Sequence, residues 1–267
     1  MEPIEYQRMR EAEEQHWWYA GLHDLAIRWI QREATRIHHP LAILDAGCGT
    51  GRLCQLMQPF GTVTGCDRHP LAVAATAARG IQRVLQRDLG TDKLGDKEYD
   101  LITCMDVLYH RAVTDAAATL QNLHQALKPG GLLLGHVAAF EFLRGDHDVA
   151  VHTRRRYRRQ ELARLLQAAG LKIEFISYRL PLCLVPALLW RCRSRHRPLQ
   201  RELHSDIAWR NPAGMNRWLT SLIRIENRLL LAGWRMPFGT SLFVSARKRK
   251  LPGFLATCLK SGAPTDA

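Results

Sequence analysis

The sequence lacks the paired cysteines that mark a disulfide framework or a zinc site. Its seven cysteines contain no C-x-x-C spacing, the usual pattern of thiol pairs that bind zinc or exchange disulfides. Four of them, Cys48, Cys54, Cys66 and Cys104, lie in or beside apolar runs or in a glycine-rich stretch. We therefore expect buried free thiols in a protein of a reducing compartment.

Long apolar runs are also missing. No stretch approaches the roughly 20 apolar residues that a membrane-spanning helix needs. The first residues, Met1–Glu14, are charged and lack the apolar core of a secretory signal. With 46% hydrophobic and 24% charged residues, the composition is that of an ordinary globular protein. We expect a cytoplasmic protein, in which any membrane contact is peripheral and on the inner face.

Acidic residues are scarce in the C-terminal part of the chain. Residues 1–150 carry 15 Lys and Arg against 19 Asp and Glu, whereas residues 151–267 carry 23 against 6. The net charges of the two parts are therefore −4 and +17. Two interpretations stay open: the basic part meets an anionic partner, or it is a solvated, arginine-rich surface.

The stretch Leu41–Leu53, which reads LAILDAGCGTGRL, is the most informative in the chain. Its first residues predict a short strand buried on both faces of a parallel sheet. Glycines at alternate positions follow, where the backbone can turn sharply and approach a ligand, and Arg52–Met57 then predict a helix. Strand, glycine turn and helix open a nucleotide-binding unit, although the spacing is G-x-G-x-G and not that of dinucleotide sites.

An acidic residue follows each of the next predicted strands. Thr62–Asp67 ends in an acid twenty residues after Gly47, where such folds place a carboxylate on ribose hydroxyls. A third strand, beginning near Gly80, ends at Asp88, and a fourth is Tyr99–Asp106. The carboxyl ends of parallel strands share one edge of the sheet, so we expect these acids to line a common site.

These motifs together resemble the class I S-adenosylmethionine-dependent methyltransferases. The matching words are LDAGCGTG, CD and RD after the second and third strands, YDLITCMDVLYH, and LKPGGLLLGH, and they cover residues 41–140. The resemblance implies an α/β, Rossmann-like sheet of seven strands with the last strand antiparallel. Leu171–Tyr178 and Thr240–Lys248 then become the sixth and seventh strands.

The resemblance also implies S-adenosylmethionine as the cofactor and assigns its contacts. Asp45 and the three glycines would hold the methionine part, Asp67 the ribose and Asp88 the adenine. The complete predicted set is Asp45, Gly47, Cys48, Gly49, Gly51, Asp67, Arg68, Asp88, Leu89, Met105 and Asp106.

The remaining segments surround this core. Apolar residues at helical spacing from Trp18 to about Ala34 predict an N-terminal helical cap. The long connection between the sixth and seventh strands predicts a helical insertion. We thus expect a cap at 1–40, the core at 41–180, the insertion at 181–238, the final strand at 239–250 and a tail at 251–267.

The acceptor of the methyl group would lie between the cap and the loop after the fourth strand. His110 has the pKa range of a general base for a hydroxyl acceptor, although a histidine flanking a helix would look the same. The aromatic cluster near His16 could form a lid or simply pack on the sheet. Our candidate acceptor contacts are His16, Trp17, Tyr19, Tyr109, His147, Arg155 and Tyr157.

The segment Glu141–Tyr157 is dense in charged residues and imidazoles. Its acids and histidines lack the spacing of a zinc motif, so we expect no metal. Its pattern of H-D followed by R-R-Y, with the early H-W-W, resembles a bacterial methyltransferase subgroup. Arg158 stands where that subgroup often has a small capping residue, which weakens the start of the helix predicted at Gln160–Ala169.

The insertion begins with eleven uncharged residues, Leu180–Trp190, and alternating arginines follow them up to Arg197. An apolar run too short to span a bilayer, beside arginines, is typical of segments that lie on an anionic membrane surface. The same leucines could instead pack under the core or line a pocket. We expect a small-molecule or lipid-linked acceptor, with oxygen favoured over carbon or nitrogen as the atom methylated. RNA methylation through the basic C-terminal part is the alternative.

Overall fold

A seven-stranded mixed sheet forms the centre of the computed structural model, which describes residues 3–194 and 212–250. The strand order is β3-β2-β1-β4-β5-β7-β6, and β7 runs antiparallel to both of its neighbours. The predicted fold class is therefore confirmed. The strands are β1 (Leu41–Ala46), β2 (Gly61–Asp67), β3 (Arg83–Gln86), β4 (Tyr99–Met105), β5 (Leu127–Ala138), β6 (Leu171–Arg179) and β7 (Ser241–Lys248).

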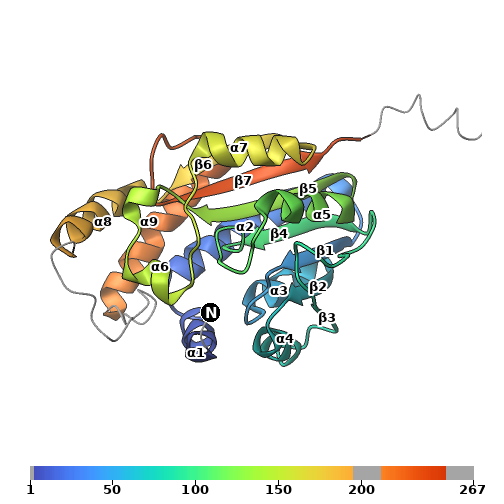
Figure 1. Ribbon diagram of the computed structural model, residues 1–267, viewed down its shortest axis with the longest axis horizontal. Coiled ribbons are helices and arrows are strands. Elements are labelled where there is room, and N and C mark those ends of the chain that lie inside the picture. Colours follow the sequence, from blue (N-terminus) through green and yellow to red (C-terminus); the bar gives the residue numbers. More distant parts are fainter. Residues whose placement is uncertain (1–2, 195–211, 251–267) are drawn as a thin grey trace, which may run out of the picture.

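Helices cover both faces of this sheet (Figure 1). Adjacent residues of β1 point to opposite faces, as expected of a strand buried on both sides. Ile43 packs in the apolar cluster under α2, α3 and α9, and Leu44 packs in the cluster under α5 and α7. The helical elements are α1 (Pro3–Ala12), α2 (Trp17–Ile37), α3 (Arg52–Met57), η1 (Gln58–Phe60), α4 (Pro70–Ala77), α5 (Ala116–Ala126), η2 (Glu141–Leu143), α6 (Asp146–Ala150), α7 (Arg159–Ala168), α8 (Pro181–Ser194) and α9 (Ala213–Leu231).

The N-terminal cap contains two helices, where the sequence predicted one. The apolar periodicity located α2, which ends where His38 adopts a left-handed φ of 61°. Helix α1 has no comparable apolar stripe in its sequence, PIEYQRMREA, because its few large side chains meet the glycine turn and not the core. Helix α7 begins next to Arg158, and the carboxylate of Glu161 accepts the Arg158 N–H at 3.4 Å. This reciprocal bond replaces the small capping residue that the position lacks.

The insertion contains α8 and α9, as predicted, and these helices lie near the β6 edge of the sheet, opposite β3 (Figure 1). Helix α9 packs against α2, where Asn227 donates to the Gly21 carbonyl at 2.8 Å and to the Asp24 carboxylate at 2.9 Å. Among the described helices, none combines the length and apolar character needed to cross a membrane. The tail predicted at 251–267 and the arginines from Arg195 onward lie outside the described residues.

A buried ion pair organises the segment between β5 and α7. Both carboxylate oxygens of Asp148 bind the guanidinium of Arg156, at 2.8 and 3.1 Å. Arg156 also donates to the Ala139 carbonyl at the end of β5, at 3.0 Å. Neighbouring Arg154 donates its N–H to the Tyr109 carbonyl at 2.8 Å. The H-D and R-R-Y pattern therefore fastens this segment to β5 and to the loop after β4.

Asp148→Ala should lower the free energy of unfolding by about 3 to 5 kcal/mol, because it leaves the charge of Arg156 buried without its partner. Urea denaturation of the two proteins measures this difference. Asp96→Ala, at an exposed position, is the matched control and should change the free energy by less than about 0.5 kcal/mol. A loss below about 1 kcal/mol for Asp148→Ala would contradict the structural role of the pair.

Candidate functional site

The glycine turn after β1 bends the chain back onto the end of β2. Gly47, Gly49 and Gly51 have φ values of 84°, 55° and 81°, in the left-handed region that favours glycine. The N–H groups of Gly47 and Cys48 both donate to the Cys66 carbonyl, at 2.7 and 3.0 Å. A Cβ added to Gly47 would lie 2.2 Å from Val107 Cγ2. The turn is thus held against the loop after β4 and has no room for a side chain there.

Two of the predicted acids lie beside this turn. Asp45 is buried, and it accepts bonds from Thr103 Oγ1 at 2.6 Å and Cys54 Sγ at 3.2 Å, while burial raises its pKa to about 6. Asp67 accepts the N–H groups of Gly49 and His69, at 3.1 and 2.9 Å. Asp45 therefore joins the end of β1 to β4 and α3, whereas Asp67 binds the turn itself through the Gly49 N–H. The contact of Asp67 with a ribose remains a prediction.

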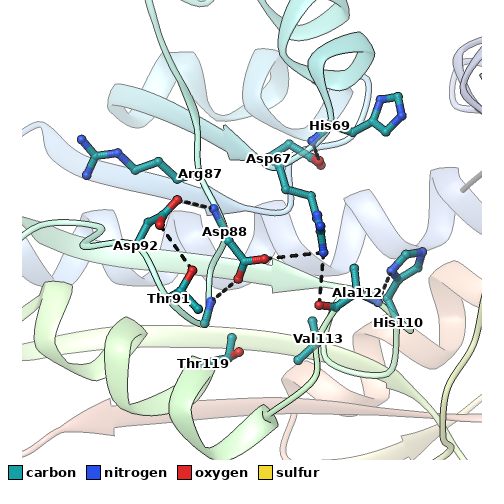
Figure 2. Close-up of polar contacts among 12 residues, drawn as sticks. Asp67, His69, Arg87, Asp88, Thr91, Asp92, His110, Ala112, Val113 and Thr119 are labelled. Atoms are coloured by element: carbon teal, nitrogen blue, oxygen red, sulfur yellow. Dashed lines mark hydrogen bonds and ion pairs between the residues drawn. The ribbon is translucent and has the colours of Figure 1, made fainter.

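Asp88, labelled in Figure 2, pairs with Arg68 at the third part of this edge. Asp88 accepts the Gly90 N–H at 2.8 Å, and its other oxygen lies 3.5 Å from Arg68 Nη1. The same nitrogen lies 3.4 Å from the Ala112 carbonyl in the loop after β4. This pair is partly exposed and contributes little to stability by itself.

The other predicted cofactor contacts lie around the same turn. Cys48 is buried with its Sγ 3.3 Å from Thr76 Oγ1, Leu89 is buried in the core, and Met105 ends β4. The structure thus brings the carboxyl ends of β1, β2 and β4 together with the residues after β3, as the spacing predicted. The individual cofactor contacts remain predictions.

Helix α1 covers the glycine turn, which the sequence did not reveal. The ring of Tyr6 stacks on His69 with centroids 4.8 Å apart, and a Cβ on Gly49 would lie 2.9 Å from Met9 Cε. Glu13, in the turn after α1, accepts a bond from Thr50 and pairs with Arg79 at 3.3 Å. Burial raises the pKa of Glu13 to about 7. The cap is therefore joined directly to the cofactor side.

The start of α2 and the loop after β4 bring further predicted residues together. His16 caps α2, its Nδ1 accepting the Trp18 N–H at 3.3 Å, and the Trp17 N–H donates to Asn216 at 2.9 Å. Tyr19 is buried, with its ring at the edge of Trp18. Burial and the charge of Asp106 raise the pKa of Tyr109, and Tyr19 acts on the same hydroxyl.

His110 lies on the loop after β4, which Figure 2 shows. Its Nδ1 accepts the Ala112 N–H at 3.1 Å, and its ring centroid lies 6.0 Å from that of His152. Burial is the largest of the causes that lower its pKa to about 4. In the neutral ring, Nε2 then carries the proton. His110, the predicted base, therefore donates a hydrogen bond at Nε2 and does not accept one there. Its catalytic role remains a prediction.

The last predicted acceptor contacts have structural partners. Tyr157 is fully buried and donates its hydroxyl to the Leu108 carbonyl at 3.0 Å. Arg155 lies 4.5 Å over the Tyr157 ring and pairs with Glu161. The side chain of His147 lies outside the described residues. Arg155 also donates its main-chain N–H to the Tyr109 carbonyl at 3.4 Å. The roles of these residues at the acceptor stay predictions.

His136, which we did not predict, lies at the end of β5 beside Asp106. Its Nδ1 is 2.9 Å from Asp106 Oδ1, and its side chain is 1% exposed. Asp106 has a left-handed φ of 60° and donates its N–H to the His136 carbonyl at 3.0 Å. The only signal in the sequence is a histidine at the end of the apolar run LLLGH.

Comparison with known proteins agrees with this arrangement. A model of a methyltransferase-domain family matches residues 17–174. The chain is a class I S-adenosylmethionine-dependent methyltransferase. Its glycine turn, which has no room for a Cβ at Gly47, and the Asp67 carboxylate beside it fit this cofactor. Within the part of the chain that the structure describes, no three metal-ligating side chains gather into a cluster.

The methyltransferase has curated relatives named ubiquinone biosynthesis O-methyltransferase. That of Pseudomonas syringae pv. tomato is 34% identical over 137 residues, covering 45% of this chain but only 57% of the relative. That of Pseudomonas paraeruginosa is 30% identical over 200 residues, covering 62% of this chain and 82% of the relative.

Solved structures resemble the methyltransferase in fold alone. A Thermotoga maritima methyltransferase, described as a possible histamine N-methyltransferase, has a TM-score of 0.54 at 15% identity and covers 92% of this chain and 96% of its own. The [4+2]-cyclase SpnF has a TM-score of 0.53 at 18% identity, with coverages of 85% and 82%. Such different activities on one fold show that the acceptor must be inferred from the site.

S-adenosylhomocysteine should raise the melting temperature of the wild-type protein, because it binds the folded state only. Asp67→Ala removes the carboxylate beside the turn, and Gly49→Val places a branched side chain at a left-handed position against Met9. Both variants should lose most of the shift while remaining folded.

Gly214→Ala is the matched control, because no atom lies within 4 Å of the added Cβ, and it should keep the full shift. If Asp67→Ala and Gly49→Val also keep it, the cofactor does not bind at this turn. Differential scanning fluorimetry over a ligand titration provides the measurement.

Proposed function

We propose that the protein methylates a hydroxyl group of a small-molecule or lipid-linked acceptor. The observation that carries the proposal is the enclosed polar and aromatic edge next to the glycine turn. The Trp18 ring contacts both Tyr19 and His136, and His136 lies 2.9 Å from Asp106. Val107, the residue after Asp106, joins this group to Gly47. The names of the relatives, ubiquinone biosynthesis O-methyltransferases, support oxygen as the atom methylated.

The main task of such a site is alignment. When bound, S-adenosylmethionine supplies an electrophilic methyl group on a sulfonium. The protein must hold an acceptor oxygen in line with that group and exclude water. Helix α1 and the turn after it cover the glycine turn through Met9 and Glu13, and this cover shields that side of the site from water. RNA methylation gains no support from the relatives, and we do not propose it.

A screen with methyl-labelled S-adenosylmethionine tests this function. The probes are hydroxylated benzoates, catechols and prenylated phenols, each compared with the corresponding aniline. We expect label in an ether product of at least one hydroxyl compound and none in the matched anilines. Transfer to nitrogen or carbon alone, or to none of the compounds, would refute O-methylation.

We further propose that the insertion attaches the enzyme to an anionic membrane surface. Its helices expose large apolar side chains: Leu182 (71%), Val185 (60%) and Leu189 (67%) on α8, and Trp218 (61%) and Ile225 (53%) on α9. Arg217, Arg224 and Arg228 are exposed along α9 beside these residues. Apolar side chains that insert at the interface, next to arginines worth about 1 kcal/mol each near acidic lipid, suit such a surface.

The protein should therefore cosediment with vesicles that contain phosphatidylglycerol at low salt, and binding should fall as salt rises. Changing Arg217, Arg224 and Arg228 to glutamine should remove most of the binding without lowering the melting temperature. Changing Arg83, Lys93 and Arg158, which are exposed elsewhere, is the matched control and should leave binding nearly intact. Equal loss in both triple variants would show a general charge effect, and absence of binding at low salt would refute the attachment.

A further inference from the structure

Several buried polar atoms gather on the face of the sheet under α2 and α9. Among the described residues, no hydrogen-bond partner is present for Asp106 Oδ2, His136 Nε2, Arg179 Nε and Nη1, or Ser241 Oγ. These residues lie at the ends of neighbouring strands, since Met105 is opposite His136 and Ser241 is opposite both Ala138 and Arg179. An unpaired buried polar group lowers the free energy of unfolding by about 1 to 3 kcal/mol. This row of residues, Asp106, His136, Arg179 and Ser241, is therefore suited to bind polar groups of a ligand.

The Asp106 carboxylate determines which nitrogen of His136 is free. Its Oδ1 lies 2.9 Å from Nδ1, and a carboxylate accepts hydrogen bonds, so Nδ1 carries the proton. Nε2 therefore presents a lone pair, as a base requires. Asp106 adopts its left-handed conformation at this point, which costs of order 1 to 3 kcal/mol for a residue other than glycine. Such strain is common where a side chain must be aimed at a substrate.

His136 also lies close to both halves of the site. The ring of Trp18, in the cap, lies 5.9 Å from the His136 ring. Asp106 immediately precedes Val107, whose side chain contacts the glycine turn at Gly47. Besides burial, the negative charge of the same carboxylate raises the pKa of the Tyr109 hydroxyl. An acceptor held between the cap and the glycine turn would therefore meet His136.

We propose that His136 is the general base that removes the acceptor's hydroxyl proton, and that Asp106 is its positioning residue. This inference rests on the proposed O-methylation. The proton passes to Nε2 as the acceptor oxygen gains the methyl group and a neutral thioether is displaced. The imidazolium formed is stabilised by Asp106 and then releases its proton to water, so that the products are a methyl ether and a free proton.

The charges around the row indicate the class of acceptor. Arg179 is fully buried, and its Nε lies 3.7 Å from Glu226 Oε1, so the two charges balance. Asp106 adds a negative charge on the same side, which acts on Arg179. An acceptor with its own negative charge would be repelled, whereas a neutral hydroxyl compound can donate to His136 and accept from the free Arg179 donors. We therefore infer a neutral hydroxyl acceptor, such as a phenol.

The two histidines differ in tautomer, and nuclear magnetic resonance can distinguish them. The full-length protein, labelled with ¹⁵N histidine and saturated with S-adenosylhomocysteine, is compared with His136→Gln and His110→Gln to assign each ring. We expect His136 to be protonated at Nδ1 and bare at Nε2, and Asp106→Asn to abolish this preference. A His136 ring protonated at Nε2 in the wild-type complex would overturn the proposal, whatever acceptor is found.

Activity with a phenol identified in the screen supplies the second measurement. His136→Gln should lower kcat by about 100-fold or more while the affinity for S-adenosylhomocysteine changes less than twofold. His39→Gln, at an exposed position before β1, is the matched control and should keep full activity. If His110→Gln lowers kcat strongly and His136→Gln does not, the general base is His110 and the proposal is wrong. If no hydroxyl compound is methylated, the proposed function fails, and the tautomer measurement still decides the state of His136.

Discussion

The close packing of the glycine turn against the loop after β4 is the constraint on which the site depends. Gly47 can approach Val107 only because it has no Cβ, and its N–H is held by the end of β2. One short contact therefore joins three strand ends. It sets the separation between the cofactor side, with Asp67 and Asp88, and the side with Asp106, Tyr109 and His136. In-line transfer tolerates little error in that separation, so the position needs glycine for geometry as well as for flexibility.

The sequence predicted the parts of this site that repeat a local rule. Alternate glycines require left-handed conformations, and acids that end parallel strands must meet at one edge, so the turn, Asp45, Asp67 and Asp88 could be placed in advance. His136 could not, because its role comes from the neighbouring strand: nothing within LLLGH indicates that Asp106 lies 2.9 Å away. The contact of Glu13 with Thr50 was hidden for the same reason. Contacts between distant segments depend on the tertiary fold, which local spacing does not encode.

In the densely charged segment between β5 and α7, residues that we expected at the acceptor form structural contacts. Its acids, histidines and arginines suggested an acceptor loop, yet Asp148 and Arg156 neutralise each other in a buried pair, and Tyr157 binds a main-chain carbonyl. Charged side chains can be buried only with partners, so a cluster of both signs often compensates itself. Such a segment still serves the site indirectly, since Arg154 holds the main chain of Tyr109. The H-D and R-R-Y motif therefore indicates how the loop after β4 is held in place, and it says little about the reaction.

The order of the strands has a consequence for how the chain is made. Strand β7 is the last to leave the ribosome, yet it lies between β5 and β6 and is hydrogen-bonded to both. Until residues 241–248 emerge, β6 has no neighbour in the sheet among the described strands, and α8 and α9 have already been synthesised. While the insertion is being synthesised, the sheet therefore lacks the strand that lies between β5 and β6. Synthesis that stops before Ser241 would leave β5 without its antiparallel partner, so the main-chain N–H and C=O groups along β5 would form an open edge.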